Sequence, residues 1–340
     1  IRVKSTQKPP AEPSFFSEWK AQWLTRFEGM NWETIIGTYI VPRLGALGVT
    51  IAVFIALALL AQKYGAGLRV FLGYLVATGL IGGAFYTEKR YKDYSRVLFS
   101  AGLAMAYFVT FATHYIPFAK IFESPLPALG GMALIVGIWA GIAQKRRSPT
   151  VALLVTLLGH FTIALTVFSV ADAELYFAGF GILLLSVGSA FFLLRNGWYY
   201  VAAVGMVLSY ANHLGVMSQS PGSDTVQQFT VGMVVLTAYL LIFGLSELYA
   251  PEELRRKKVP SWFRSIFVTV NTASFFALGS LMVDGHTFSH ESHHVFRYVL
   301  AAVLMGLGAL YYLRRKHDPL YNTYITKSIA LLTFGLAYQF

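Results

Sequence analysis

The sequence contains no cysteine and few charged residues. The missing cysteines exclude disulfide bonds, thiolate metal sites and cysteine nucleophiles. Only 13% of the residues are charged, whereas an ordinary soluble domain has about 25%. Hydrophobic residues make up 56% of the chain, and the mean hydropathy is +0.57. This composition indicates a polytopic membrane protein rather than a set of soluble domains.

Long apolar runs fill most of the 340 residues. A run of about 18 or more apolar residues with few charges is typical of a transmembrane helix. Short polar connections separate the runs, so successive helices are expected to form hairpin pairs. We therefore predict an all-α, polytopic transmembrane bundle of about eleven spans, at residues 44–62, 68–86, 97–116, 126–143, 150–170, 175–194, 198–217, 228–248, 263–283, 295–313 and 323–340.

Helix-start signals and basic residues support this division. Ser148-Pro149 is a capping residue followed by a first-turn proline, and Pro125 and Pro127 open the preceding span. Lysine and arginine gather in alternate connections, at 89–96, 145–147 and 314–316 among others. Because such residues concentrate on the cytoplasmic side, we predict a cytoplasmic amino terminus and a location in the bacterial inner membrane.

The net charge of +11 is spread over short turns. A dispersed basic charge favours contact with anionic lipid headgroups, and it is not the footprint of a nucleic-acid-binding protein. The lipid bilayer and other membrane protein subunits are therefore the expected partners.

Residues 14–30 form a candidate amphipathic helix ahead of the first span. Aromatic residues recur there at every fourth position, namely Phe15, Trp19, Trp23 and Phe27. Such a face suits the headgroup region of a membrane, and packing against another subunit is the alternative. We expect a cytoplasmic tail over 1–31 and a transmembrane domain over 32–340. Because the sequence stops within an apolar run, we also expect further sequence at the carboxyl end.

Catalytic motifs are missing from the sequence. It has no GxSxG, no P-loop and no long exterior loop with paired carboxylates. We expect a protein that is not an enzyme and that uses no cofactor.

Polar residues within the apolar runs are the remaining candidates for function, because such residues are costly in a bilayer. The polar intramembrane candidates are His160, Asn212 and Asn271. Carboxylates are absent from the span centres, since Glu247 and Asp284 lie at span ends. A proton- or sodium-coupled carrier usually keeps a central carboxylate, so this class is disfavoured.

Three histidines are weak candidates for cofactor ligation: His114, His160 and His213. A haem takes two axial ligands from facing helices, and His114 and His213 are expected at similar depth. Hydrogen bonding between neighbouring helices is the favoured alternative for a single histidine in a span.

The connection 284–294, DGHTFSHESHH, concentrates four of the eight histidines on the predicted exterior side. Three of them follow an i, i+4, i+8 pattern that would line one face of a helix and hold zinc, copper or nickel. Gly285 and the serines instead favour an irregular turn. We predict no bound metal and a helix that begins near Ser289 or Ser292. The metal candidates are His286, His290, His293 and His294.

Residues 65–117 resemble domain-of-unknown-function family 2339 of bacterial membrane proteins. The matching positions are Gly67, Arg69, Gly73, Glu88, Tyr94, Gly102 and Tyr107, with Asn31-Trp32 ahead of Gly37 as a loose entry motif. The chain departs from the family in its single Gly102, where a glycine cluster is typical, and it lacks the charged amino-terminal coiled coil and many of the helices expected. The resemblance implies a polytopic architecture and no assigned activity.

These observations leave three hypotheses. The first is a structural or accessory subunit that packs with other membrane or envelope components, supported by short loops, by abundant aromatic residues and by the small-residue pairs Gly79/Gly83 and Gly137/Gly141. Those glycines would equally serve packing within the protein. The second is a transporter or flippase for a lipid-linked or small polar solute. The third is a metal- or haem-handling membrane protein.

Overall fold

The computed structural model describes residues 65–169, 175–218, 226–252, 259–285, 291–316 and 318–337, with positions 48 and 52. All regular structure in these residues is helical. The helices are α4 (Ala66–Thr87), α5 (Lys92–Tyr115), the short 3₁₀ helix η2 (Pro117–Ala119), α6 (Pro125–Lys145), α7 (Pro149–Ser169), α8 (Leu175–Asn196), α9 (Tyr199–Ser218), α10 (Val226–Tyr249), α12 (Ser261–Gly285), α13 (Glu291–Arg314) and α14 (Leu320–Ala337).

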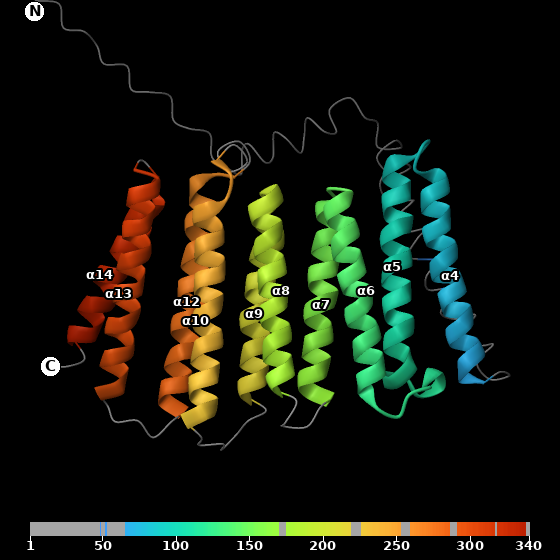
Figure 1. Ribbon diagram of the computed structural model, residues 1–340, viewed down its shortest axis with the longest axis horizontal. Coiled ribbons are helices and arrows are strands. Elements are labelled where there is room, and N and C mark those ends of the chain that lie inside the picture. The colour runs from blue at the N-terminus through green and yellow to red at the C-terminus, as the bar shows by residue number, and fades with distance from the viewer. Residues whose placement is uncertain are drawn as a thin grey trace, which may run out of the picture.

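The long helices stand side by side in a row that follows the order of the chain (Figure 1). Successive helices run in opposite directions, and α4 packs on α5, α6 on α7, α8 on α9 and α13 on α14. The row therefore consists of hairpins, as the short connections predict. Further contacts of α7 with α9 and of α8 with α10 join the hairpins to one another.

Helix boundaries follow the expected sequence signals. α6 begins at Pro125, where the Ser124 hydroxyl accepts a hydrogen bond from the Leu126 amide at 3.4 Å. α7 begins at Pro149, directly after the predicted cap. α13 is described from Glu291, and residues 286–290 ahead of it lie outside the described part, so its start near Ser289 or Ser292 stays a prediction.

Nine of the ten α-helices in the described part are long and apolar enough to cross a membrane, all except α14. α14 is shorter and carries Asn322, Thr326 and Lys327 in its first half. The expected span at 44–62 lies outside the described residues, as do the tail and its amphipathic helix. The count of eleven spans therefore stays a prediction, whereas ten of the expected ranges coincide with helices.

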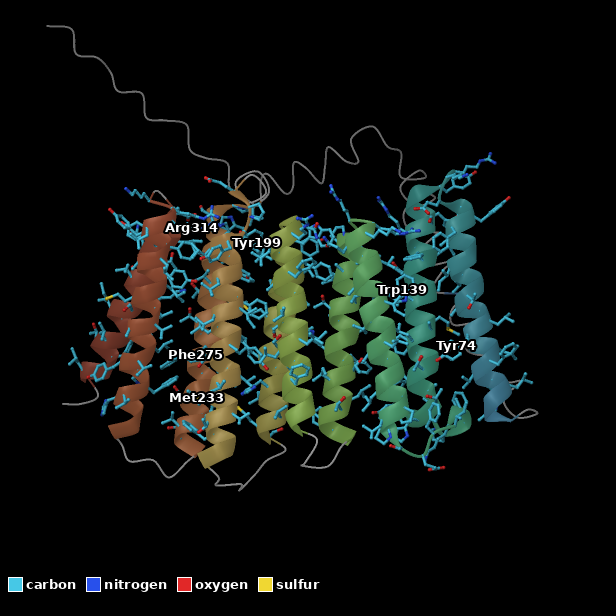
Figure 2. The ribbon with its side chains drawn as sticks, in the orientation of Figure 1. Tyr74, Trp139, Tyr199, Met233, Phe275 and Arg314 are labelled. Carbon is cyan, nitrogen blue, oxygen red and sulfur yellow. The ribbon has the colours of Figure 1, made fainter. Side chains whose placement is uncertain are left out.

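Two apolar cores hold the row together. One centres on α5, α6 and α7, where the Phe99 and Trp139 rings lie 4.3 Å apart between centroids. The other joins α9, α10, α12, α13 and α14 through residues such as Tyr239, Phe243 and Leu304. Side chains from all the long helices fill the spaces between them (Figure 2).

The basic turns that follow α4, α6, α8 and α13 all lie along the same edge of the row, where these helices end (the upper edge in Figure 1). We call this the basic end. Lys120, in the connection between α5 and α6, lies at the opposite end. Basic and non-basic connections thus alternate between the two edges of the row, and the basic end is the edge that carries the basic ones.

Candidate functional site

A buried charged cluster lies at the basic end between α10, α12 and the turn before α14. The Arg264 Nε atom donates to Glu247 Oε1 at 2.6 Å, and its Nη2 atom donates to Asp318 Oδ2 at 2.8 Å. The Glu247 side chain is fully buried, and those of Arg264 and Asp318 are nearly so. Charges in such surroundings are tolerated only when they are paired and hydrogen-bonded.

Two tyrosines complete the hydrogen bonding of Glu247. The Tyr199 hydroxyl of α9 donates to Oε1 at 3.1 Å, and the Tyr311 hydroxyl of α13 donates to Oε2. The Leu320 amide donates to Asp318 Oδ1 at 3.1 Å. Each of the four carboxylate oxygens of the cluster therefore accepts a hydrogen bond from the protein. We name Glu247, Arg264 and Asp318 with these two tyrosines the charged cluster.

Arg315 forms a second set of hydrogen bonds at the basic end. Its Nε and Nη2 atoms donate to the carbonyl oxygens of Leu248 and Ala250 at 3.0 and 2.8 Å. These carbonyls lie at the end of α10, where a helix leaves its last carbonyl groups without helical partners. Together, these contacts join the ends of α9, α10, α12, α13 and α14.

The charged cluster is the polar site that the sequence analysis missed. Glu247 lies in the last turns of α10 and Arg264 in the first turn of α12. In antiparallel neighbours these two positions meet, so the opposite charges at adjoining span ends were the available signal. The sequence analysis considered Glu247 only as a carboxylate at a span end and did not pair it with Arg264.

His160 lies in the middle of α7 and is buried, with 1% of its surface exposed. Its Nδ1 atom is 2.9 Å from the Thr156 carbonyl oxygen, and its Nε2 atom is 3.1 Å from the Ser209 hydroxyl of α9. Ser209 in turn lies 2.7 Å from the Ser186 hydroxyl of α8. The imidazole is therefore enclosed and bonded to a neighbouring helix.

The two amide candidates also join helices. The Asn212 Nδ2 atom of α9 donates to the His160 carbonyl oxygen at 3.0 Å. The Asn271 Nδ2 atom of α12 donates to the Leu240 carbonyl oxygen of α10 at 3.0 Å, and its Oδ1 atom accepts from the Tyr210 hydroxyl at 2.8 Å. Both amides thus bridge helices.

His114 and His213 are not brought together. His114 Nδ1 lies 3.0 Å from the Phe122 carbonyl oxygen, in the connection that follows α5. His213 lies on α9, edge-on to the Tyr239 ring of α10 with 5.7 Å between ring centroids. α6 and α7 stand between α5 and α9 in the row (Figure 1). The two histidines therefore do not form the facing pair that a haem requires.

The histidine-rich connection falls mostly outside the described residues. Of its four histidines, only His294 has a described side chain, and its Nδ1 atom is buried without a hydrogen-bond partner. No cluster of three or more metal-ligating residues occurs in the part of the chain that the structure describes. The prediction that this connection binds no metal, at His286, His290, His293 and His294, is left for experiment.

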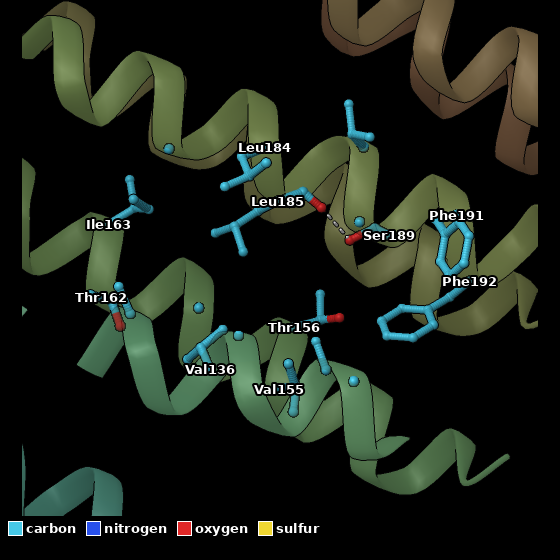
Figure 3. Close-up of a pocket in the computed structure, with 18 of the residues that line it drawn as sticks. Val136, Val155, Thr156, Thr162, Ile163, Leu184, Leu185, Ser189, Phe191 and Phe192 are labelled. Carbon is cyan, nitrogen blue, oxygen red and sulfur yellow. Dashed lines mark hydrogen bonds between the residues drawn. The ribbon is translucent and has the colours of Figure 1, made fainter. Parts of the chain in front are cut away.

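An apolar groove of about 610 Å³ runs between α6, α7 and α8. Leu184 and Leu185 of α8 lie opposite Val136 and Val155 of α6 and α7, and Phe192 closes one side (Figure 3). The glycines that line it include Gly137, Gly141, Gly159, Gly181 and Gly188. At Gly137, Gly141 and Gly188, an added Cβ would meet no atom within 4 Å. Those three glycines line open space and do not pack against a neighbouring helix.

The packed row of long apolar helices and the polar residues that fasten it define a multi-pass, all-helical membrane protein. Within this class, the chain belongs to the family of predicted membrane proteins DUF2339, whose model matches residues 37–340. The match extends well beyond residues 65–117, which carry the resemblance in the sequence. No curated protein and no solved structure matches the chain.

Proposed function

We propose that this protein is a non-enzymatic subunit of the bacterial inner membrane that packs with other membrane or envelope components. The observation that carries the proposal is the use of its intramembrane polar groups. His160, Asn212 and Asn271 each bond a neighbouring helix, and the charged cluster satisfies its own charges. A solute pathway needs polar groups that face a passage, whereas these groups fasten helices.

Outward-facing apolar side chains supply the surface for partners. On α4, the first helix of the row, Phe71 and Leu75 are 61% and 56% exposed. On α14, the last helix of the row, Ile329 and Phe334 are 54% and 62% exposed. Such surfaces contact lipid or other helices in a membrane.

Site-specific photo-crosslinking in intact cells tests this function. A photoreactive amino acid is placed at Leu75 or Ile329, with fully buried Leu103 as the control. We expect a protein adduct of discrete size from at least one outward position and none from Leu103. The adduct should match a protein that co-purifies stoichiometrically with the unmodified chain. Adducts with lipid alone, at these positions and at further exposed positions of α8 and α13, would contradict the proposal.

A transporter of a lipid-linked or small polar solute is the second candidate. The observation in its favour is the pair His213 Nε2 and Tyr239 Oη, which are buried without a hydrogen-bond partner. Buried polar atoms of this kind usually bond an ordered water or a ligand. A cysteine at position 213 that reacts with a small water-soluble thiol reagent would favour this candidate, because the reagent reaches it only through water.

The cytoplasmic position of the basic end is part of the proposal, because basic residues concentrate on that side. Residues 1–340 contain no cysteine, so single cysteines introduced among them report cleanly. We expect Lys120→Cys to react with a membrane-impermeant reagent in intact cells and Lys145→Cys to react only after lysis. The opposite pattern would reverse the orientation.

A further inference from the structure

The groove between α6, α7 and α8 offers hydrocarbon and almost no free polar groups. Its hydroxyl groups bond their own helices, since Thr156 donates to the Ala152 carbonyl, Thr162 to Leu158 and Ser189 to Leu185. Its volume of about 610 Å³ falls within the roughly 300–1,000 Å³ of pockets that enclose small ligands. An occupant must therefore be apolar where it lies in the groove.

The length of the groove matches one leaflet of a bilayer, and its α6 side reaches the basic end at Gln144. It extends along α6 from Ala133 to Gln144 and along α8 from Gly181 to Phe192, which is ~16 Å at 1.5 Å per helical residue. Half of the hydrocarbon core of a bilayer is also about 15 Å. On α6 this stretch lies mainly in the half of the helix that leads to the basic end, whereas on α8 it lies around the middle of the helix and stops at Phe192, before the helix ends at Asn196. A transmembrane helix of a partner would instead contact the full thickness.

Three exposed cations surround the end of the groove that lies at the basic end. Gln144 lines the groove and accepts a hydrogen bond from Asn196 at 2.6 Å. Lys145 and Arg195 directly adjoin these two residues, and Arg147 lies in the turn that joins α6 to α7. All three side chains are exposed. This is the depth at which the phosphate of a lipid lies when its chains occupy the same leaflet.

The backbone of Arg147 is unusual. Its φ of 49° lies in the left-handed region, where Gly197 with φ of 68° closes the corresponding turn between α8 and α9. The turn is a Schellman type, with the Ser148 amide donating to the Ala143 carbonyl at 3.0 Å. Glycine is the usual residue at this position because it has no Cβ. The chain instead carries an arginine beside the groove.

We propose that the groove binds an alkyl chain of an anionic phospholipid from the leaflet at the basic end, while Lys145, Arg147 and Arg195 bind its headgroup. The apolar lining, the one-leaflet length and the basic rim select this ligand together. The open positions of Gly137, Gly141 and Gly188 provide the width for the chain. This site does not depend on whether the protein has subunit partners.

Filling the groove tests the chain-binding half of the proposal. Purified protein is titrated with phosphatidylglycerol or with phosphatidylcholine of the same chains, and bound lipid is counted by native mass spectrometry. Gly137→Leu and Gly141→Leu start from positions where an added Cβ meets no atom within 4 Å, and circular dichroism of each variant checks that it is folded. We expect either variant to lower the retention of both lipids tenfold or more. Gly82→Leu is the matched control, since an added Cβ there is also in open space but outside the groove.

Removing the cations tests the headgroup half. A cation near a membrane surface contributes about 1 kcal/mol to binding of anionic lipid, which corresponds to about fivefold in affinity. We therefore expect Lys145→Gln and Arg195→Gln each to weaken phosphatidylglycerol binding about fivefold and to leave phosphatidylcholine binding unchanged. Lys89→Gln, an exposed cation at the α4 turn, should change neither.

Several results would overturn the proposal. Unchanged lipid retention in the two leucine variants would exclude chain binding in the groove. Equal binding of the two lipids, unaffected by the charge variants, would exclude headgroup recognition. In vesicles of phosphatidylcholine with a minor fraction of photoactivatable phosphatidylglycerol, crosslinks should map to α6, α7 and α8, and a random distribution over all helices would also contradict the site. A protein adduct from a crosslinker at Leu185 in intact cells would assign the groove to a partner helix instead.

Discussion

At the basic end of the row, two groups of helices meet in opposite ways. α10, α12 and α13 converge on buried charges, with Arg264 bonded to both Glu247 and Asp318. α6, α7 and α8 converge on an apolar groove and keep their cations at the surface. The nearest ion pair there, Arg146 with Glu88 at 3.2 Å, has side chains that are 25% and 45% exposed.

The difference shows which contacts each group of helices relies on. A buried ion pair loses its hydration and is stable only when all its hydrogen bonds are made, so it fixes one arrangement of the helices around it. A half-exposed pair contributes little. In α4–α8, the arrangement of the helices is instead fixed by the close packing of small residues against neighbouring side chains. Because no buried ion pair holds α6, α7 and α8 together, an open groove between them does not disrupt such a pair.

The largest effect is expected from removing the central cation of the charged cluster. Arg264→Met leaves two buried carboxylates without their partner, and breaking a buried pair in this way costs about 3–5 kcal/mol. Arg146→Met is the control and should cost less than Arg264→Met, because it loses a half-exposed ion pair worth less than ~1 kcal/mol and the contacts of its guanidinium with the Phe85 and Phe99 rings but leaves no buried charge unpaired. Unfolding of both variants in mild detergent or nanodiscs measures the difference. Equal losses of stability would show that the two regions do not differ as described.

A smaller effect is expected where α4 packs on α5 through glycine. A Cβ added at Gly102 would lie 2.7 Å from Ile81 Cγ1 and 3.1 Å from the Ala77 carbonyl oxygen, which is backbone and cannot move away alone. We expect Gly102→Ala to destabilise the protein by about 1–3 kcal/mol. Gly79→Ala meets no atom within 4 Å and should be neutral or slightly stabilising. The comparison fails if both changes have the same cost in equilibrium unfolding.

The smallest effect concerns the neutral hydrogen bonds that link α7, α8 and α9. Ser209→Ala removes the hydroxyl that bonds His160 and Ser186, and hydrogen bonds between membrane helices contribute about 0.6 kcal/mol on average. Thr269→Ala is a suitable control, because the Thr269 hydroxyl is exposed and bonds only the Ser265 carbonyl of its own helix. Steric-trapping measurements of unfolding resolve this difference. A loss approaching that of Arg264→Met would place the main polar anchor at His160 instead.

The sequence predicted helices well because their signals are local. Apolar runs, the prolines at 125 and 149 and the basic turns each depend on a few adjoining residues, and ten of the expected ranges coincide with helices. The family assignment was confirmed over a longer stretch than the motifs suggested. α14, predicted as a span, differs from the other described α-helices in not being apolar enough to cross a membrane, because its polar residues lie within the helix and not in the connection.

Contacts between distant helices could not be obtained in the same way. Asp318 follows Arg264 by 54 positions, and periodicity within either helix says nothing about that pairing. The glycine pair Gly137/Gly141 identified a small-residue face, but the sequence did not show whether another helix fills it. His160 illustrates the converse, since its depth was predictable and its partner Ser209 was not.

The order of the hairpins has a consequence for biosynthesis. Most helices pack against the one made just before them, so hairpins can assemble while the chain is still leaving the ribosome. The polar contacts at the basic end form later, because the bond of Glu247 to Tyr311 joins residues 64 positions apart and that of Arg315 to Leu248 joins residues 67 positions apart. The Glu247 carboxylate can pair with Arg264 as soon as α12 is made, but its Oε2 atom lacks the Tyr311 hydroxyl until α13 is made. The hydrogen bonding of the charged cluster is complete only once α13 and the turn to α14 are made, since these supply Tyr311 and Asp318.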